Sequence, residues 1–294
     1  MKISVIDIGS NTVKMKIFDE KINQLVSEVE NAKLISYIEN KNLNDAGTEL
    51  LKNILVRFSE LSKKNGCEKI YPFATASLRK AENREKVIEY IKEKTGLEIE
   101  LLSGEDEAKL SFSGAMREKE KLASDGVFFD MGGGSTEVIP YTDFTEKQRV
   151  SLPFGSLSTL LEFSKDGITD YAGIKNKVLS HAGNEVFSKK AQRGAIVGGT
   201  AYAICKLYNK MISPDQTRLD VKLLKNLFEK IKEPDEKTLL FMKVLVPDRI
   251  DTVRSGLCAY LALFDIFGIE SVDICFSGIR EGYLIRKLYG ENLI

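Results

Sequence analysis

Two stretches of the sequence combine a carboxylate, glycines and hydroxyls in a pattern that suits phosphate. In residues 127–139, VFFDMGGGSTEVI, Asp130 ends one apolar run and a second apolar run follows the glycines. Glycines between two strands allow a backbone to approach a ligand, and successive N–H groups in such a turn can surround phosphate oxygens. A carboxylate beside them could hold Mg²⁺. A plain β-hairpin capped by Asp130 is the alternative. The predicted phosphate-binding residues are Gly132, Gly133, Gly134, Ser135 and Thr136.

The N-terminus repeats this plan. In residues 4–18, SVIDIGSNTVKMKIF, an apolar run ends in a carboxylate, a glycine and hydroxyls follow, and a second strand alternates apolar residues with lysines. The repetition favours the phosphate-binding interpretation over a plain hairpin at both places. Here the carboxylate is Asp7, and the predicted phosphate-binding residues are Gly9, Ser10, Asn11 and Thr12.

The histidine and cysteine content disfavours several classes of catalytic and metal site. His181 is the only histidine, which disfavours Ser-His-Asp triads and histidine-rich metal centres. The four cysteines are scattered among apolar segments, so we expect buried thiols rather than disulfides or a metal site. No cysteine lies six positions before an arginine, and no GxxxxGK[ST] loop occurs. Chemistry on phosphate would therefore proceed without a covalent intermediate, or with an unusual one.

The length of the chain indicates the number of domains, and its charge indicates the kinds of partner to expect. A chain of 294 residues exceeds the usual size of one hydrophobic core, so we expect two domains. Lys and Arg together number 43, as do Asp and Glu, so no overall basic field attracts DNA, RNA or an anionic membrane. No apolar run approaches the length of a membrane span, and Asp7 interrupts the first apolar run too early for a secretory signal. We expect a cytoplasmic protein.

Hydrophobic periodicity predicts two α/β domains, one at 1–120 and one at 121–294. The charged segment 118–125 marks the boundary, and the closing helix, about 279–294, is a candidate to pack back on the first domain. The expected strands are 2–8, 13–18, 24–30, 69–74, 97–102, 126–131, 136–141, 147–152, 194–197 and 271–276. The expected helices are 46–65, 82–95, 103–117, 156–163, 170–188, 201–210, a block over 219–267, and 278–289.

Seven motifs, in order along nearly the whole chain, resemble the exopolyphosphatase and guanosine pentaphosphate phosphatase (Ppx/GppA) family in its short form. The resemblance implies two actin-like (ASKHA, ribonuclease H-like) α/β domains with a cleft between them, and Mg²⁺ dependence. It also implies that K⁺ is a candidate activator of the enzyme and that the protein is a candidate homodimer. The motifs are DIGSNT at 7–12, ATASLR at 74–79, SGEDEA at 103–108, DMGGGSTE at 130–137, GGT at 198–200, PDRIDTVRSG at 247–256 and SGIREG at 277–282.

The acidic residues take their roles from this resemblance. Glu107 matches the glutamate that activates the attacking water, and a carboxylate is the only type of base that this histidine-poor chain offers. Its neighbour Asp106 replaces a family glutamate and is explained by capping the helix that Ser103 begins. Asp130 and Glu137 match acidic residues that hold Mg²⁺, with Asp7 as their counterpart in the first domain. An exposed strand residue is the alternative interpretation of Glu137.

Three further positions complete the predicted site. Arg79 is expected to contact phosphate, because guanidinium groups bind it in a bidentate manner; a surface helix residue is the alternative. The segment Gly198, Gly199 and Thr200, between a strand and a helix, is expected near a nucleotide or further phosphates, or else forms only a tight turn. Arg280 is expected mainly to fix the closing helix, and reach into the cleft is the alternative.

The predicted reaction is in-line attack of water on the terminal phosphoryl group of inorganic polyphosphate, with Glu107 as general base. The first alternative substrate is guanosine pentaphosphate (pppGpp), the nucleotide of the stringent response, which would yield ppGpp. A second alternative is a regulatory protein that binds these polyanions without hydrolysing them. A sugar kinase of the same superfold is disfavoured by the SGEDEA and SGIREG motifs.

Overall fold

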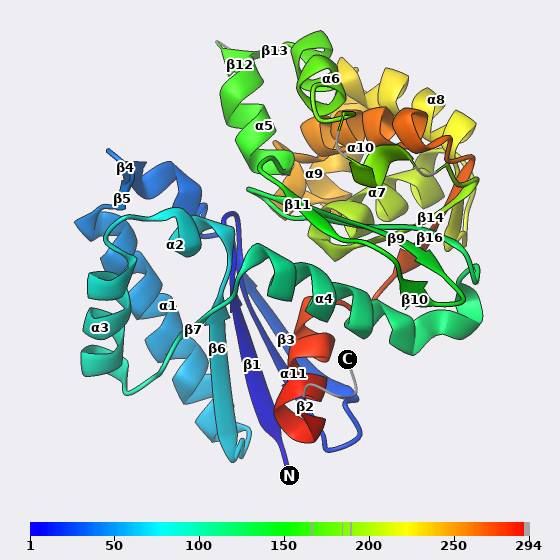
Figure 1. The fold of residues 1–294 in the computed structure, drawn as a ribbon. Helices are drawn as coiled ribbons and strands as arrows, with labels where there is room; N and C mark the ends of the chain where they lie inside the picture. Colours follow the sequence, from blue (N-terminus) through cyan, green and yellow to red (C-terminus); the bar gives the residue numbers. More distant parts are fainter. Residues whose placement is uncertain (166, 184, 189, 291–294) are drawn as a thin grey trace. The chain divides into compact units, whose positions relative to one another are not determined.

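The computed structural model describes residues 1–165, 167–183, 185–188 and 190–290 as a mixed α/β chain (Figure 1). The chain divides into two compact units. Unit 1 contains Met1–Leu110 and the C-terminal helix from Ile279, and unit 2 contains Ser111–Gly278. The predicted domains instead divide after residue 120. The structural division lies earlier, within helix α4 (Gly104–Ala115). The C-terminal part of this helix belongs to unit 2, because Phe112 packs on Phe128 and Tyr141.

Unit 1 is built on a five-stranded sheet with the order β3-β2-β1-β6-β7. The first three strands are antiparallel neighbours, whereas β6 and β7 run parallel to β1. In β2, Val13, Met15 and Ile17 face a hydrophobic core, and the lysines between them face the other side of the sheet. The strands are β1 (Ile3–Ile8), β2 (Val13–Phe18), β3 (Gln24–Glu30), β6 (Lys69–Ala74) and β7 (Glu100–Leu101).

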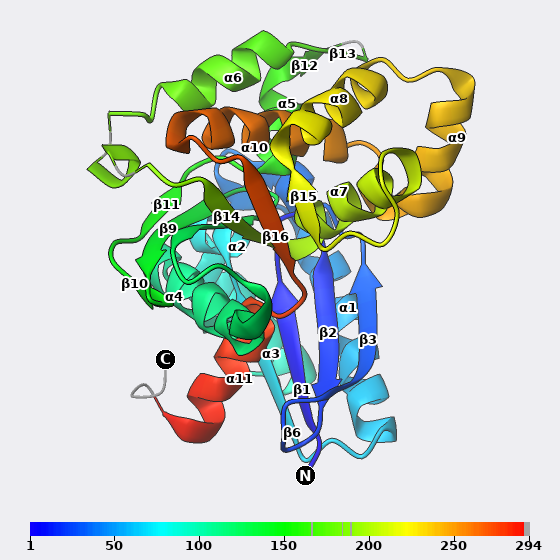
Figure 2. The same cartoon turned by 90° about the vertical axis from the view of Figure 1, so that its right-hand side faces the viewer.

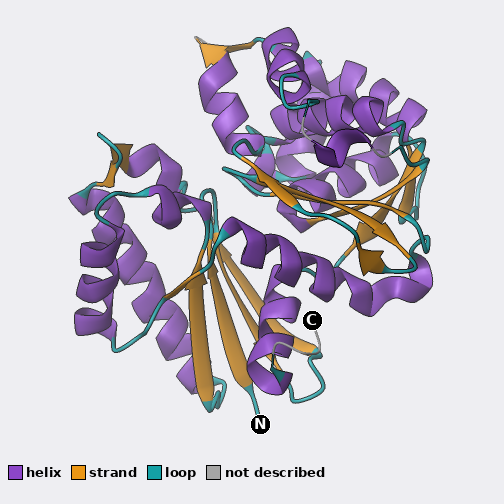
Figure 3. Cartoon of the chain, in the orientation of Figure 1, coloured by secondary structure: helices purple, strands orange, loops and turns teal. Residues whose placement is uncertain are grey.

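Helices cover both faces of this sheet (Figure 3). On one face α1 and α3 pack through Leu51, Leu55 and Ile91, and on the other α11 packs through Tyr283 and Leu284. The C-terminal helix is thus part of the core of unit 1. The remaining elements are η1 (Leu34–Tyr37), β4 (Ile38–Glu39), β5 (Asn42–Leu43), α1 (Asp45–Lys64), α2 (Ala76–Lys80), α3 (Arg84–Thr95) and α11 (Ile279–Tyr289).

Unit 2 contains a second mixed sheet, with the order β10-β9-β8-β14-β16-β15 and with β11 also paired to β9. As in unit 1, it starts with an antiparallel hairpin, β8 and β9, whose first strand is flanked by a parallel strand, here β14. The strands are β8 (Gly126–Met131), β9 (Thr136–Thr142), β10 (Thr145–Glu146), β11 (Val150–Leu152), β14 (Arg193–Val197), β15 (Arg218–Asp220) and β16 (Ser271–Cys275).

Helix α10 is the centre of the unit 2 core and is buried along almost its whole length (Figure 2). On the opposite face of the sheet, Phe112 of α4 packs on Phe128 and Tyr141. No helix among the described residues is long and apolar enough to span a bilayer. The other elements are η2 (Met116–Lys121), α5 (Ser156–Phe163), β12 (Ser164–Lys165), β13 (Ile168–Thr169), α6 (Tyr171–Leu179), η3 (Glu185–Ser188), α7 (Gly198–Met211), α8 (Val221–Lys232), α9 (Glu236–Leu245), η4 (Pro247–Arg249) and α10 (Val253–Phe267).

Candidate functional site

The two glycine turns have the same backbone geometry. In unit 1 the Gly9 N–H donates to the Thr12 carbonyl at 3.1 Å, and in unit 2 the Gly132 N–H donates to the Ser135 carbonyl at 3.0 Å. Each turn joins the two strands of an antiparallel hairpin. The repeat in the sequence is therefore a repeat in structure. The first glycine amide of each turn is used to close the turn.

Asn11 is the least satisfied polar side chain of the unit 1 turn. It is 2% exposed, and neither its Nδ2 nor its Oδ1 has a hydrogen-bond partner among the described residues. The backbone around it is well held, because the carbonyls of Ser10 and Asn11 accept from Ile35 and Lys33. A buried carboxamide without partners is costly, so its retention points to a ligand that supplies them.

The unit 2 turn is supported from behind by helix α5. The first three N–H groups of α5 donate to the carbonyls of Gly132 and Gly133 at 2.8 to 3.0 Å. This approach requires Gly155, since a Cβ at that position would lie 2.6 Å from the Gly132 carbonyl oxygen. The sequence analysis missed Gly155, although a glycine directly before a predicted helix was visible. The glycine turn is thereby fixed before any ligand binds.

Asp130 and Glu137 lie directly opposite each other on β8 and β9. Glu137 is 1% exposed, which excludes the alternative of an exposed strand residue. The hydroxyl of Ser151 donates to Glu137 Oε1 at 2.9 Å, and the hydroxyl of Ser111 donates to Asp130 Oδ2. Opposed carboxylates on neighbouring strands repel each other, and a cation between them relieves that repulsion. Neither serine was singled out from the sequence.

This pair of carboxylates fits Mg²⁺. Magnesium is usually held by one or two carboxylates, several waters and the phosphates of a substrate, rather than by a full cage of protein ligands. In keeping with that, no group of three or more His, Cys, Asp or Glu side chains arranged to hold a metal occurs in the described parts of the chain. Mg²⁺ at Asp130 and Glu137 stays a prediction.

Asp7 has a different environment. Arg280 Nη1 donates to Asp7 Oδ2 at 2.7 Å, and the residue opposite Asp7 on β2 is Lys14. A guanidinium therefore already neutralises the charge of this carboxylate through Oδ2, and no second carboxylate lies opposite Asp7 on β2. The metal role of Asp7 stays a prediction, and the pair of opposed carboxylates seen at Asp130 and Glu137 is not found at Asp7. Arg280 does fix the closing helix, as expected, and the partner it uses is a predicted site residue.

Arg79 and Glu107 form a pair within unit 1. Nη1 of Arg79 donates to Glu107 Oε2 at 2.8 Å and to the Leu102 carbonyl at 3.0 Å. Glu107 is 7% exposed, and Arg79 is only partly exposed, so the alternative of a surface arginine is excluded. The two contacts use Nη1 of the guanidinium, which leaves the hydrogens of Nε and Nη2 for a phosphoryl oxygen.

The start of α4 is held independently of Glu107. The Ser103 hydroxyl accepts from the Asp106 N–H at 3.0 Å and donates to Asp106 Oδ2 at 2.7 Å. Asp106 and Ser103 thus cap the helix, as expected. Arg286 of α11 lies 3.5 Å from Asp106 and strengthens this end of the helix. Capping of α4 therefore does not depend on the carboxylate of Glu107.

Gly198, Gly199 and Thr200 form the first turn of α7, directly after β14. Gly198 has a φ of 94°, and a Cβ there would lie 2.8 Å from Asp130 Oδ1. A Cβ on Gly199 would meet the guanidinium of Arg249 at 2.5 Å. The positive φ favours glycine at position 198, whereas at position 199 the end of the flexible Arg249 side chain could move aside. Unit 2 thus brings the start of α7 to the carboxylate of Asp130. Thr200 is buried, and its hydroxyl donates to Ser156 Oγ at 3.2 Å.

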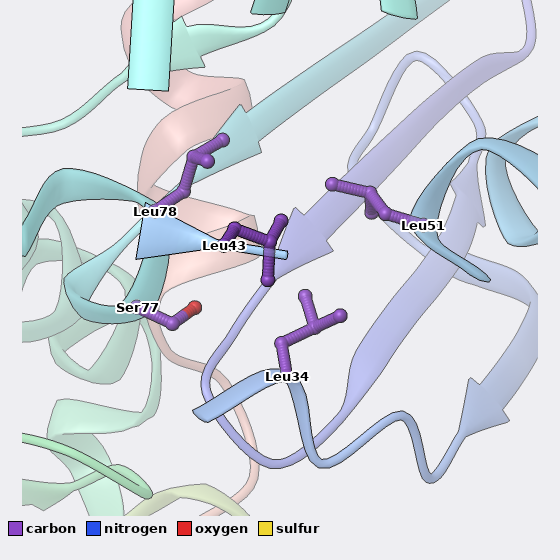
Figure 4. Close-up of a pocket in the computed structure, with 5 residues that line it drawn as sticks. All are labelled: Leu34, Leu43, Leu51, Ser77 and Leu78. Atoms are coloured by element: carbon purple, nitrogen blue, oxygen red, sulfur yellow. The ribbon is translucent and has the colours of Figure 1, made fainter. Parts of the chain in front are cut away.

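A pocket near the unit 1 turn is not a ligand site. Four leucines and Ser77 line it (Figure 4), and it has no room for a water molecule. The Ser77 hydroxyl is buried and has no hydrogen-bond partner among the described residues. We interpret this pocket as a packing gap between η1, α1 and α2. The lining residues are Leu34, Leu43, Leu51, Ser77 and Leu78.

Comparison with known proteins gives a consistent result. A model of the Ppx/GppA phosphatase family matches residues 14–291. Exopolyphosphatase 1 of Mycobacterium tuberculosis is 26% identical over 310 residues, which cover 99% of this chain and 89% of that protein. The guanosine-5'-triphosphate,3'-diphosphate pyrophosphatase of Aeromonas hydrophila is 27% identical over 301 residues, which cover 98% of this chain and 60% of that protein.

The fold has close counterparts among solved structures. A crystal structure of an exopolyphosphatase from Cytophaga hutchinsonii matches with a TM-score of 0.87 and covers 100% of this chain and 99% of that chain. The two sequences are 18% identical, so this likeness concerns the fold. It confirms the predicted fold class, an α/β protein of actin-like architecture.

Proposed function

Because this chain belongs to the Ppx/GppA phosphatase family, we propose that it is a phosphoanhydride hydrolase that releases orthophosphate from the end of inorganic polyphosphate. The observation that carries the proposal is the buried carboxylate of Glu107, which Arg79 holds in one orientation at 2.8 Å. A fixed carboxylate next to a guanidinium combines a proton acceptor with a group that stabilises phosphoryl charge. The relatives named exopolyphosphatase support the choice of substrate.

In the proposed reaction the oxygen of a water molecule attacks the terminal phosphorus in line with the bridging oxygen. The bond between that phosphorus and the bridging oxygen breaks, and the polyphosphate chain leaves with one phosphate fewer. Glu107 takes the proton of the attacking water. The free donors of Arg79 contact the equatorial oxygens, over which charge spreads in the transition state.

The two glycine turns bind and orient the phosphates. In unit 1 the buried Nδ2 of Asn11 donates to a phosphoryl oxygen, which supplies the partner it lacks. In unit 2 the turn after Asp130 and the start of α7 present backbone N–H groups. Mg²⁺ held by Asp130 and Glu137 would neutralise part of the phosphate charge.

Guanosine pentaphosphate is the second candidate substrate. Tyr202 and Phe276 are each 47% exposed and lie edge to face, with ring centroids 6.0 Å apart. Tyr202 follows the glycine turn of α7, Phe276 follows β16, and Lys206 Nζ lies 4.7 Å from the Tyr202 ring centroid. Exposed aromatic rings next to a phosphate site can stack a nucleobase, a contact worth about 1–3 kcal/mol. The relatives named pyrophosphatases of this nucleotide also support it.

The test is release of orthophosphate by the purified chain with Mg²⁺, from long polyphosphate and from guanosine pentaphosphate in parallel. We expect release from polyphosphate. Faster release from guanosine pentaphosphate would favour the second candidate. Binding of both compounds without release from either would overturn the proposed hydrolase and favour a regulatory protein.

A further inference from the structure

The two glycine turns share a backbone but differ in charge. The residues around Asp7 are cationic, namely Arg280 at 2.7 Å and Lys14 on the opposite strand. Around Asp130 the opposite residue is a second carboxylate, Glu137, and the neutral hydroxyl of Ser111 donates to Asp130. A metal ion suits the second environment and an anion suits the first.

We propose that Arg280 is a phosphate-binding residue of unit 1 and that Asp7 orients its guanidinium instead of binding the metal. This inference rests on the proposed function in one respect, because it assumes that the ligand is a phosphate chain. It gives Arg280, which was predicted mainly to fix the closing helix, a role in ligand binding. It also changes the predicted role of Asp7 from metal ligand to positioning residue.

The geometry of the pair supports this assignment. The side chains of Arg280 and Asp7 are 13% and 14% exposed, so the contact is largely shielded from water. Only Nη1 of Arg280 donates to Asp7, and the buried Nε has no hydrogen-bond partner among the described residues. A guanidinium that served only to hold α11 would be expected to satisfy its buried donors, since an unmade hydrogen bond to a buried charge is costly.

The charged side chains near Arg280 are Lys16, Glu281 and Asp7. Lys16 is bonded to Glu281 at 2.8 Å, so that anion is already paired with a cation. Lys16 thus contacts the residue that directly follows Arg280. The pKa of Lys16 is lowered by burial first and then by the positive charge of Arg280. Two neighbouring cations that are largely shielded from water are unfavourable unless an anion is near both. Asp7 supplies one such charge, and a phosphate would supply another.

The turn itself reaches this carboxylate. A Cβ on Gly9 would lie 3.9 Å from Asp7 Oδ1, so the backbone of the turn passes beside the Asp7–Arg280 pair. Asn11, two residues later, carries another buried side-chain donor that lacks a partner among the described residues. Arg280 Nε and Asn11 Nδ2 are therefore two unsatisfied donors at the carboxyl end of β1. Phosphate oxygens accept from both types of donor.

Binding of tripolyphosphate measures the proposed role without turnover. The variants Asp7→Asn, Arg280→Gln and the double variant are made in a Glu107→Gln chain, and affinity is measured by calorimetry with Mg²⁺ and again in EDTA. Loss of one charge-assisted hydrogen bond predicts affinity weakened about tenfold or more by Arg280→Gln in both buffers. The double variant should bind no more weakly than Arg280→Gln, because Asp7 acts through the arginine.

The metal is tested separately in chains that keep Glu107. We expect Asp130→Asn to raise the Mg²⁺ concentration needed for half-maximal phosphate release by about tenfold or more, and Asp7→Asn to change it less than about twofold. A rise in Asp7→Asn equal to that in Asp130→Asn, or normal tripolyphosphate affinity in Arg280→Gln, would overturn the inference.

Two controls separate this inference from other failures. Arg280→Lys keeps the positive charge and replaces Arg280→Gln in the experiment if that variant does not fold. It should still bind tripolyphosphate more weakly than the chain with Arg280, because an ammonium lacks the planar fork with which a guanidinium contacts Asp7 and a phosphate together. Normal binding by a folded Arg280→Lys would also contradict the role. If the wild-type chain binds tripolyphosphate through Arg280 but releases no phosphate, the proposed function fails while this inference stands.

Discussion

Nη1 of Arg79 lies 2.8 Å from Oε2 of Glu107, and the same nitrogen donates to the carbonyl of Leu102. The arginine is in the short helix α2 and the glutamate is near the start of α4. Two motifs that the sequence analysis treated separately therefore form one side-chain pair. This contact orients the proposed base and places a cation beside it.

Asn11→Leu is expected to separate stability from function. Since both polar atoms of Asn11 are buried without partners, an apolar residue of similar size should leave the free energy of unfolding unchanged or raise it by about 1 kcal/mol. Affinity for tripolyphosphate should fall. Urea unfolding and calorimetry measure the two effects.

Asn83→Leu is the matched control for that variant. Both groups of the Asn83 carboxamide are hydrogen-bonded to the backbone of Leu43, at 2.9 and 3.0 Å. Its replacement should lower stability by about 1–3 kcal/mol while the affinity for tripolyphosphate is kept. If Asn11→Leu were destabilised as strongly as Asn83→Leu, the idea of an unsatisfied ligand-binding side chain would be wrong.

Gly155→Ala should damage the unit 2 turn. The added methyl group would lie within 2.6 to 2.8 Å of backbone atoms of Gly132, Gly133 and Gly134, which cannot move aside as a flexible side chain could. We expect a loss of about 1–3 kcal/mol of stability together with reduced phosphate release. Gly183→Ala is the control, because no atom of the described residues beyond the chain neighbours lies within 4 Å of a Cβ there. Equal behaviour of the two variants would show that the close approach is unimportant.

Removal of Mg²⁺ should stop turnover. Asp130 and Glu137 are both anionic and so is the substrate, so a cation between them is needed to neutralise part of the phosphate charge. Phosphate release should be lost in EDTA and restored by excess Mg²⁺. Undiminished release in EDTA would refute the metal's role. Chain unfolding in EDTA should be unchanged, which distinguishes loss of the metal from loss of the fold.

Acid should weaken the docking of α11 through Glu100. Burial by itself would raise the pKa of Glu100, but hydrogen bonds from Lys287 and Tyr283 outweigh it and lower the pKa below its ordinary 4.5. The stabilisation is therefore present above pH 4.5 and is lost as the pH falls through the lower pKa of the folded state. The free energy of unfolding of Glu100→Gln should depend less on pH in that range than that of the wild type. Parallel profiles would contradict this role.

Local pattern predicted much of the fold. The strands Val13–Phe18, Lys69–Ala74 and Gly126–Met131 have the predicted bounds, because alternation or an unbroken apolar run defines each one. Where tertiary pairing decides, the sequence was less informative. The edge strand β15 lies at the start of a segment that we expected to be helical, and the strand expected at 97–102 is reduced to β7. Short edge strands carry little periodic signal.

The site shows the same division between local and long-range information. Residue types and turns identified Asp7, Asp130 and the glycines, since these signals lie within a few adjacent positions. The partner of Asp7 could not be predicted, because Arg280 is 273 residues away and reaches it only once α11 packs on the sheet. The close approach of Gly155 to the second turn likewise depends on how α5 packs.

The most direct test of the account compares phosphate release from long polyphosphate by the wild type, Glu107→Gln and Glu105→Gln. Glu105 is an exposed neighbour in the same helical turn and serves as the matched control. We predict that Glu107→Gln keeps its fold and its affinity for tripolyphosphate but releases phosphate about 10²- to 10⁴-fold more slowly, whereas Glu105→Gln is fully active. Full activity in Glu107→Gln would contradict the assignment of Glu107 as the base.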